Sequence, residues 1–169
     1  GIQDFFLSEM SNLNTFHNTG TGTKHLSGIT IPVETKTVQQ IAAGRRIDLI
    51  RMDVEGHEIE VINGLIPAIE NKEMTPTIIF ETHLSRYNVD HDMKAPLRRL
   101  FSLGYHLAVV SSSSKRGTKI IESLGYQGNQ SAHSDGVVRT LFADLADDDA
   151  IELICSRGGV RTAVLAPKP

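Results

Sequence analysis

Short apolar runs and longer amphipathic stretches alternate along most of the chain. The apolar runs have the length of β-strands, and the amphipathic stretches repeat apolar residues at the three- and four-residue spacing of helices. We predict strands over residues 4–8, 29–33, 47–54, 77–82, 105–110, 137–145 and 160–165, and helices over 37–43, 56–69, 95–103, 118–124 and 147–156. This alternation favours an α/β fold. A length of 169 residues fits a single domain over 1–169.

The stretch 47–60 joins a buried strand to a cluster of acids. The strand is apolar on both faces, as expected where helices cover both sides of a sheet. It ends at Asp53 and Glu55, Gly56 then marks a tight turn, and Glu58 falls in the first helical turn, where a negative charge is favourable. Ligands of open α/β sheets bind beyond the carboxyl ends of strands, so we expect a functional site here.

Several segments predict interruptions. Residues 10–28, 111–117 and 125–136 are rich in polar residues and glycine, which is typical of loops. In the helix after Gly56, the positions of Gly64 and Pro67 predict a break, with one segment ending at the glycine and a second beginning near the proline.

Two predicted strands end in side chains that can transfer protons. Asp53 and Glu55 end the first, and Glu81 and His83 end the second. If these strands are neighbours, the four side chains face one crevice, and His57 can join them from the start of the helix. Carboxylates beside an imidazole suit general-base work near neutral pH, so all five are candidate catalytic residues.

Each candidate also has a structural interpretation. Glu55 can cap backbone amides at the helix start. Glu81 can pair with Arg86 or Arg51, and His83 can hydrogen-bond a loop carbonyl. An Asp, Glu and His cluster can also bind a divalent metal. The residues favour the structural interpretation over a metal site, so we assign no metal ligands.

Other polar residues give weaker signals. Ser11 and Asn12 lie in the first polar loop, from which they can reach a polyol, and we name them as candidate substrate-binding residues. The single cysteine, Cys155, excludes an internal disulfide and a cysteine-based zinc site. The remaining histidines show no ligand spacing and receive no role: His17, His25, His91, His106 and His133.

Composition narrows the range of partners. A net charge of −3 gives no electrostatic case for binding nucleic acid or an anionic membrane, and the absence of tryptophan disfavours base stacking. The sequence has no apolar run long enough to cross a bilayer and no signal peptide at its start, so we expect a cytoplasmic protein.

The order of several motifs resembles one known family. Asp53-Val-Glu-Gly56 with Glu58 after it, Phe80-Glu-Thr-His83 downstream and the upstream Ile31-Pro-Val-Glu-Thr35 resemble the motifs of FkbM-type methyltransferases, over about residues 4–110. The resemblance implies a Rossmann-like fold and transfer of a methyl group from S-adenosylmethionine, usually to oxygen on sugars and other natural products. The implied acceptor is therefore a small molecule or a carbohydrate.

The chain departs from the family at its start. It lacks the glycine-rich loop that grips the methionine part of the cofactor, and the Glu that binds the ribose. We therefore expect the C-terminal portion of a Rossmann-like methyltransferase sheet. Whether it binds the cofactor alone stays open, and its cofactor-binding residues are unknown. An open sheet edge should remain, through which the chain can form a homo-oligomer. Two alternatives are a non-catalytic binding or assembly module and a metal-dependent hydrolase that uses the same carboxylates.

Overall fold

The computed structural model describes residues 1–10, 13–18 and 24–168. The candidate substrate-binding residues Ser11 and Asn12 lie outside the described residues. In the part that is described, no helix is both long enough and apolar enough to span a bilayer.

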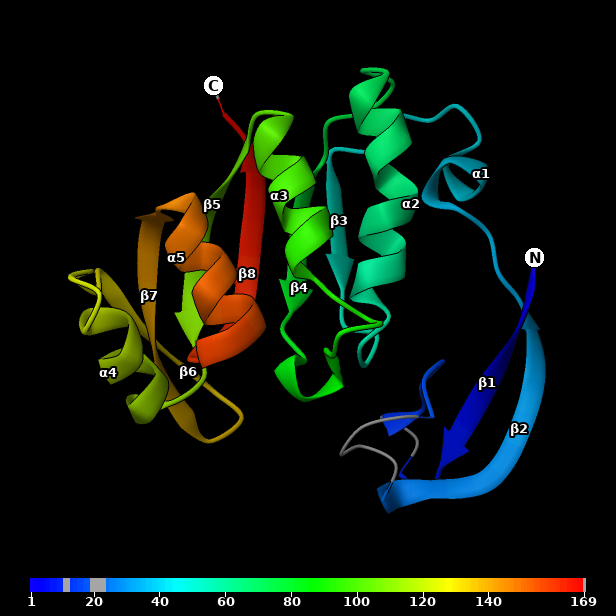
Figure 1. Cartoon of the computed structure of the whole chain (residues 1–169), viewed down its shortest axis with the longest axis horizontal. Coiled ribbons are helices and arrows are strands. Elements are labelled where there is room, and N and C mark those ends of the chain that lie inside the picture. Colours follow the sequence, from blue (N-terminus) through cyan, green and yellow to red (C-terminus); the bar gives the residue numbers. More distant parts are fainter. Residues whose placement is uncertain (11–12, 19–23, 169) are drawn as a thin grey trace.

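A six-stranded mixed sheet forms the centre of the molecule (Figure 1). Its strand order is β3 (Leu49–Met52), β4 (Thr77–Glu81), β8 (Val160–Pro167), β5 (Tyr105–Ser112), β7 (Val137–Leu145) and β6 (Gln130–Ser134). β3 and β4 are parallel, and the other neighbours are antiparallel. β8, the last strand in sequence, is inserted between β4 and β5. The α/β prediction is confirmed at the level of a mixed α/β sheet with helices.

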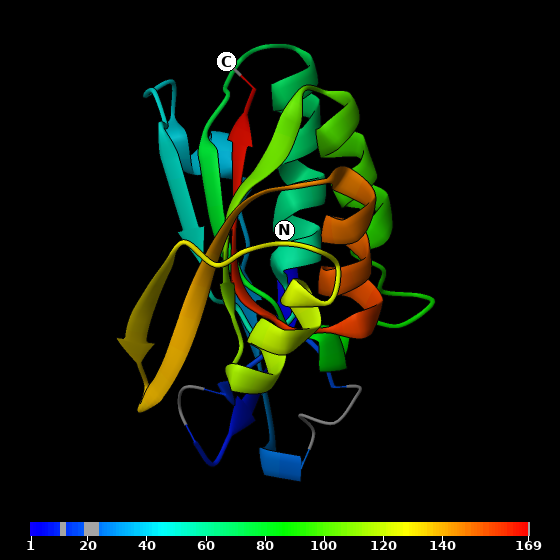
Figure 2. The ribbon, with the colours of Figure 1, turned by 90° about the vertical axis from the view of Figure 1, so that its left-hand side faces the viewer.

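The larger helices lie on one face of this sheet (Figure 2). They are α2 (Glu58–Glu70), α3 (Lys94–Ser102), α4 (Lys115–Glu122) and α5 (Asp147–Glu152). Along β4, Ile78 and Phe80 are fully buried towards the helices, whereas the residues that alternate with them are half-buried. The prediction that helices cover both faces at β3 is wrong, since Leu49 is 55% exposed. A mostly antiparallel sheet can leave one face open to water.

α2 is continuous, which corrects the predicted break. Gly64 and Pro67 both lie inside the helix. Ile62, Leu65 and Ile69 form a single buried stripe on one side of it. The burial of this stripe outweighs the local cost of a glycine and a proline in a helix interior.

Most other predicted elements exist, with shifted ends. β6 occupies residues that were predicted to be loop, and its five residues are all exposed. α4 begins three residues early, at Lys115, and α5 continues into a π-helical turn, η4 (Leu153–Arg157). β6 was missed because it lies at the edge of the sheet beside β7 and its exposed residues leave no apolar pattern.

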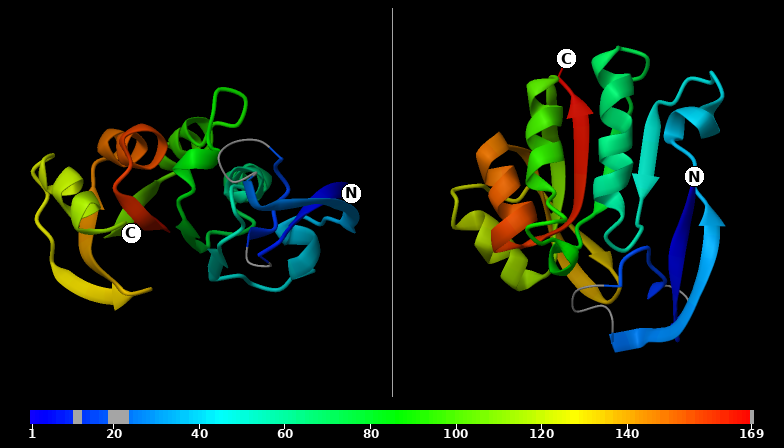
Figure 3. Two further views of the ribbon diagram at one scale, coloured as in Figure 1. Left: turned by 90° about the horizontal axis from the view of Figure 1, so that it is seen from below. Right: turned by 45° about the vertical axis from the view of Figure 1, so that its right-hand side comes forward.

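The N-terminal residues form a separate two-stranded hairpin of β1 (Ile2–Ser8) and β2 (Leu26–Glu34) (Figure 3). The short helix α1 (Val38–Ala42) follows it, with the predicted cap at Thr37. Thr15, from the segment between the two strands, is fully buried, and its hydroxyl donates to the carbonyl oxygen of Glu55 over 3.0 Å. This hydrogen bond joins the segment between β1 and β2 to the turn that follows β3.

Candidate active site

The parallel pair β3–β4 brings the predicted acids together. The register places Met52 opposite Phe80, so that Asp53 and Glu81 leave the sheet side by side. A carboxylate oxygen of Asp53, a carboxylate oxygen of Glu81 and a ring nitrogen of His83 lie within 4.8 Å of one another. The two neighbouring strands therefore end with Asp53 and Glu81 close together, and their joint role in a functional site stays a prediction.

Glu58 holds the turn between β3 and α2. Its carboxylate is fully buried and accepts the backbone N–H of Val54 and of Gly56, both over 3.0 Å. The same carboxylate lies 3.0 Å from His83 Nδ1. Capping at this turn was the structural interpretation given for Glu55, but Glu58 provides it. Glu55 instead points its side chain towards His83.

Glu55 and Gly56 both have positive φ, 51° and 102°. A Cβ on Gly56 would lie 2.9 Å from the Cβ of Arg86. The predicted tight turn is therefore confirmed, and it needs glycine for two reasons: backbone conformation and close packing.

Gly56→Ala is expected to lower the free energy of unfolding by about 1–3 kcal/mol, because the new methyl group is strained by φ and crowded by Arg86. Urea unfolding measures this loss. The matched control is Gly64→Ala in α2, where the new Cβ meets no atom within 4 Å apart from its chain neighbours and the backbone of its own helix. This control should be neutral or stabilise by up to about 1 kcal/mol. Equal effects of the two substitutions would contradict the crowded turn.

His83 is surrounded by carboxylates. Its Nε2 lies 3.7 Å from Asp53 Oδ1 and 3.6 Å from Glu55 Oε1, while Nδ1 faces Glu58. Burial acts to lower the pKa of His83, but the hydrogen bonds and charges of Glu55 and Glu58 outweigh it and raise the pKa to about 10. The ring is therefore a cation at neutral pH. This charge opposes the general-base role predicted for His83. It favours a role as a hydrogen-bond donor that orients the neighbouring carboxylates.

The pKa values of the acids around His83 shift in opposite directions. The hydrogen bond from His83 lowers the pKa of Glu55, with help from the nearby Arg86. Burial raises the pKa of Glu81 against the opposing charge of Arg161, and Asp53 adds to the rise. The partner of Glu81 is Arg161 on β8, 2.5 Å away, and not Arg51 or Arg86 as the sequence suggested. Among the acids here, Glu81 thus combines a strand-end position with a raised proton affinity.

The charge of His83 predicts a pH dependence of stability. Its folded pKa of about 10 is above the unfolded value of about 6.5, so its stabilising contribution is full below pH 6.5 and is lost as the pH rises towards 10. Urea unfolding at pH 7 and pH 10 should show a decrease in the wild type that is smaller in His83→Gln. His133→Gln, at an exposed position of β6, is the control and should follow the wild type. An identical decrease in His83→Gln would refute the assignment.

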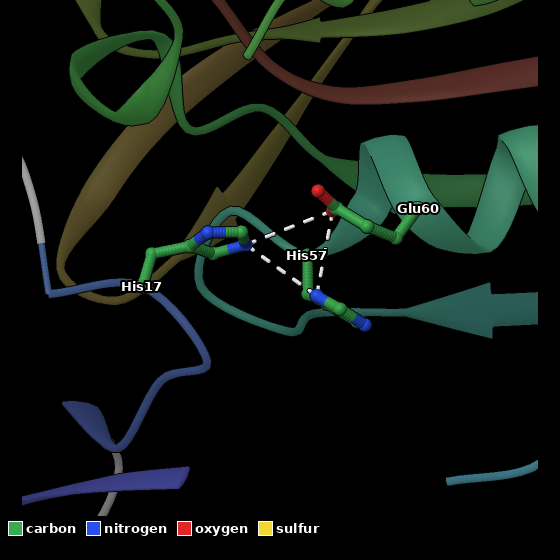
Figure 4. Close-up of side chains that lie close together, drawn as sticks. All are labelled: His17, His57 and Glu60. Carbon is green, nitrogen blue, oxygen red and sulfur yellow. Dashed lines mark hydrogen bonds and ion pairs between the residues drawn. The ribbon is translucent and has the colours of Figure 1, made fainter. Parts of the chain in front are cut away.

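His57 lies in a second cluster, at the start of α2 (Figure 4). Its Nδ1 is 3.4 Å from Glu60 Oε2 and 3.4 Å from Nε2 of His17. Burial lowers the pKa of His57, which favours its neutral ring. Burial acts to raise the pKa of Glu60, but the nearby rings of His17 and His91 prevail and lower it to about 2. Sequence reasoning named only His57 in this group; it missed His17, Glu60 and His91, which have no common spacing.

Comparison with known proteins bears on this site. The family model described as the methyltransferase FkbM domain matches residues 3–107. The chain belongs to the FkbM methyltransferase family. The match confirms the resemblance seen in the sequence and supports a methyltransferase in general. It covers both acidic strand ends and the second cluster, whereas β8 with Arg161 lies beyond it. No curated protein and no solved structure matches this FkbM-family chain.

Proposed function

We propose that this FkbM-family chain carries the acceptor side of an S-adenosylmethionine-dependent O-methyltransferase site. The acceptor is a hydroxyl of a sugar or a related small molecule. One observation supports this most: the ends of β3 and β4 place Asp53, Glu81 and His83 within 4.8 Å of one another. Such a group can hold a hydroxyl and remove its proton.

The proposal assigns a role to each residue. Asp53 and Glu81 accept hydrogen bonds from the acceptor, and Glu81, whose pKa is raised, takes the hydroxyl proton as the oxygen is methylated. His83 stays protonated and orients Asp53 and Glu55. Glu55 is a positioning residue, since its carboxylate is held between His83 and Arg86.

S-adenosylmethionine supplies the methyl group in this reaction. Among the described residues, we find no glycine-rich turn that could approach such a cofactor closely, so we assign none of them to hold it. The free side of β3 is where the proposal places further strands of a Rossmann-like sheet. In its support, β3 is an edge strand among the described residues and is parallel to β4.

A transfer assay tests the proposal. The chain is incubated with S-adenosylmethionine carrying a labelled methyl group and a panel of sugars and polyols, alone and joined to a glycine-rich strand–loop–helix unit. Label in a hydroxyl acceptor supports the function. No label on any acceptor, although calorimetry shows that the joined protein binds the cofactor, would reject it.

Calorimetry and light scattering separate the two alternatives. A metal-dependent hydrolase at these carboxylates predicts heat with Mg²⁺ or Mn²⁺ that disappears in Glu81→Gln. An assembly module predicts self-association through the free edge of β3, where Leu49 is 55% exposed. Light scattering should then show a dimer that Leu49→Lys converts to a monomer.

A further inference from the structure

Three donor atoms converge between the N-terminal hairpin and the start of α2 (Figure 4). His17 belongs to the segment between β1 and β2, His57 precedes α2 and Glu60 lies in its first turn. His17 Nε2 and His57 Nδ1 are 3.4 Å apart. Glu60 Oε2 lies 3.6 Å from the first nitrogen and 3.4 Å from the second.

These separations have the size that a bound metal ion requires. Ligand atoms at about 2.0–2.1 Å from a tetrahedral zinc ion lie about 3.3 Å from each other. The three atoms form an almost equilateral triangle of this size, so an ion can reach all three without a large movement of the side chains. The separations are longer than typical hydrogen bonds, which span about 2.7–3.2 Å.

One oxygen of the Glu60 carboxylate, Oε2, is also buried and has no hydrogen-bond partner among the described residues. A buried polar atom without a partner costs free energy, and native proteins rarely leave one without a reason. A cation in the centre of the triangle would satisfy this oxygen and both ring nitrogens at once.

His91 supports the carboxylate from the other side. Its Nδ1 lies 3.1 Å from the carbonyl oxygen of Arg86, and this contact fixes the ring. Its Nε2 then lies 2.9 Å from Glu60 Oε1. Metal ligands are commonly oriented by outer contacts of this kind, so we treat His91 as a positioning residue.

We propose that His17, His57 and Glu60 bind one divalent transition-metal ion of the zinc class. Two imidazole nitrogens and one carboxylate oxygen suit Zn²⁺, whereas Mg²⁺ and Ca²⁺ prefer oxygen ligands throughout. The site is separate from the Asp53, Glu81 and His83 group and does not depend on the proposed methyl transfer.

The geometry leaves a place for a fourth ligand. The three side chains line a pocket of about 370 Å³, together with Gln3, Asp4, Phe6, Phe16 and Asn18. Three protein ligands with an open fourth position are the arrangement in which zinc binds water or an oxygen of a small molecule. The ion would therefore stabilise the contact between the β1–β2 segment and α2, and it would remain accessible to a ligand.

Calorimetry with ZnCl₂ on the chelator-treated chain tests the proposal. At pH 7 we expect one ion per chain with a micromolar or lower Kd. His17→Ala, His57→Ala and Glu60→Gln should each weaken binding at least about tenfold. His133→Ala, on the exposed strand β6, should leave the Kd unchanged. Circular dichroism checks that each variant is folded.

A measurement on the wild type keeps the test independent of variant folding. On addition of Zn²⁺, the imidazole nitrogen resonances of His17 and His57 should shift, and that of His133 should not. Co²⁺ should give the intense visible absorption of a tetrahedral site. No zinc binding below about 1 mM, an unchanged Kd in both His17→Ala and His57→Ala, or shifts at His83 instead would each overturn the proposal.

Discussion

Glu58→Gln is expected to lower the free energy of unfolding by about 3–5 kcal/mol, the largest loss among the substitutions considered. The carboxylate is fully buried. It accepts hydrogen bonds from two backbone N–H groups and from the ring of His83. A glutamine turns an N–H₂ group towards one of these donors and removes the charge that offsets buried His83. Urea unfolding at pH 7 measures the loss.

A matched control and a double variant make this result specific. Glu73→Gln, at an exposed position after α2, should change stability by less than about 0.5 kcal/mol. His83→Gln combined with Glu58→Gln should destabilise by less than the sum of the single variants, with a coupling of about 1–3 kcal/mol. A loss below about 1 kcal/mol in Glu58→Gln would contradict the view that this carboxylate holds the turn.

The acidic strand ends could be predicted because their signal is local. Each strand is a short apolar run that ends in a charged residue, and two successive strands joined by a helix commonly lie parallel and adjacent. The register of β3 and β4 then places Asp53 beside Glu81. The turn at Gly56 was also readable, since glycine between a strand and a helix indicates a conformation that other residues avoid.

The partners of these residues could not be predicted, because they come from distant parts of the chain. Arg161 reaches Glu81 only because β8 is inserted next to β4. His17 and His91 reach the start of α2 through a segment between two hairpin strands and a turn after β4. No spacing along the sequence encodes such contacts. The charge of His83 is likewise a property of the folded state, since it results from carboxylates that only the fold brings together.

Asp53→Asn is expected to reduce methyl transfer by about 10²–10⁴-fold while leaving the fold intact. Asp53 sits at the end of β3 beside His83 and Glu81, where the proposal places the acceptor hydroxyl. Its other partner is Arg51, 3.5 Å away, and the two side chains are 31% and 62% exposed. An ion pair this exposed contributes at most about 1 kcal/mol, so its loss should leave stability almost unchanged.

The matched control for this prediction is Asp48→Asn, just before β3. Its carboxylate pairs with Arg46 at an exposed position away from the acidic strand ends. Both variants are assayed with labelled S-adenosylmethionine in the form of the protein that shows transfer, and both should melt close to the wild type. Because only Asp53 borders the proposed acceptor, only its replacement should abolish turnover. Wild-type turnover in Asp53→Asn would remove Asp53 from the site and leave Glu81 to be tested as the residue that binds the hydroxyl.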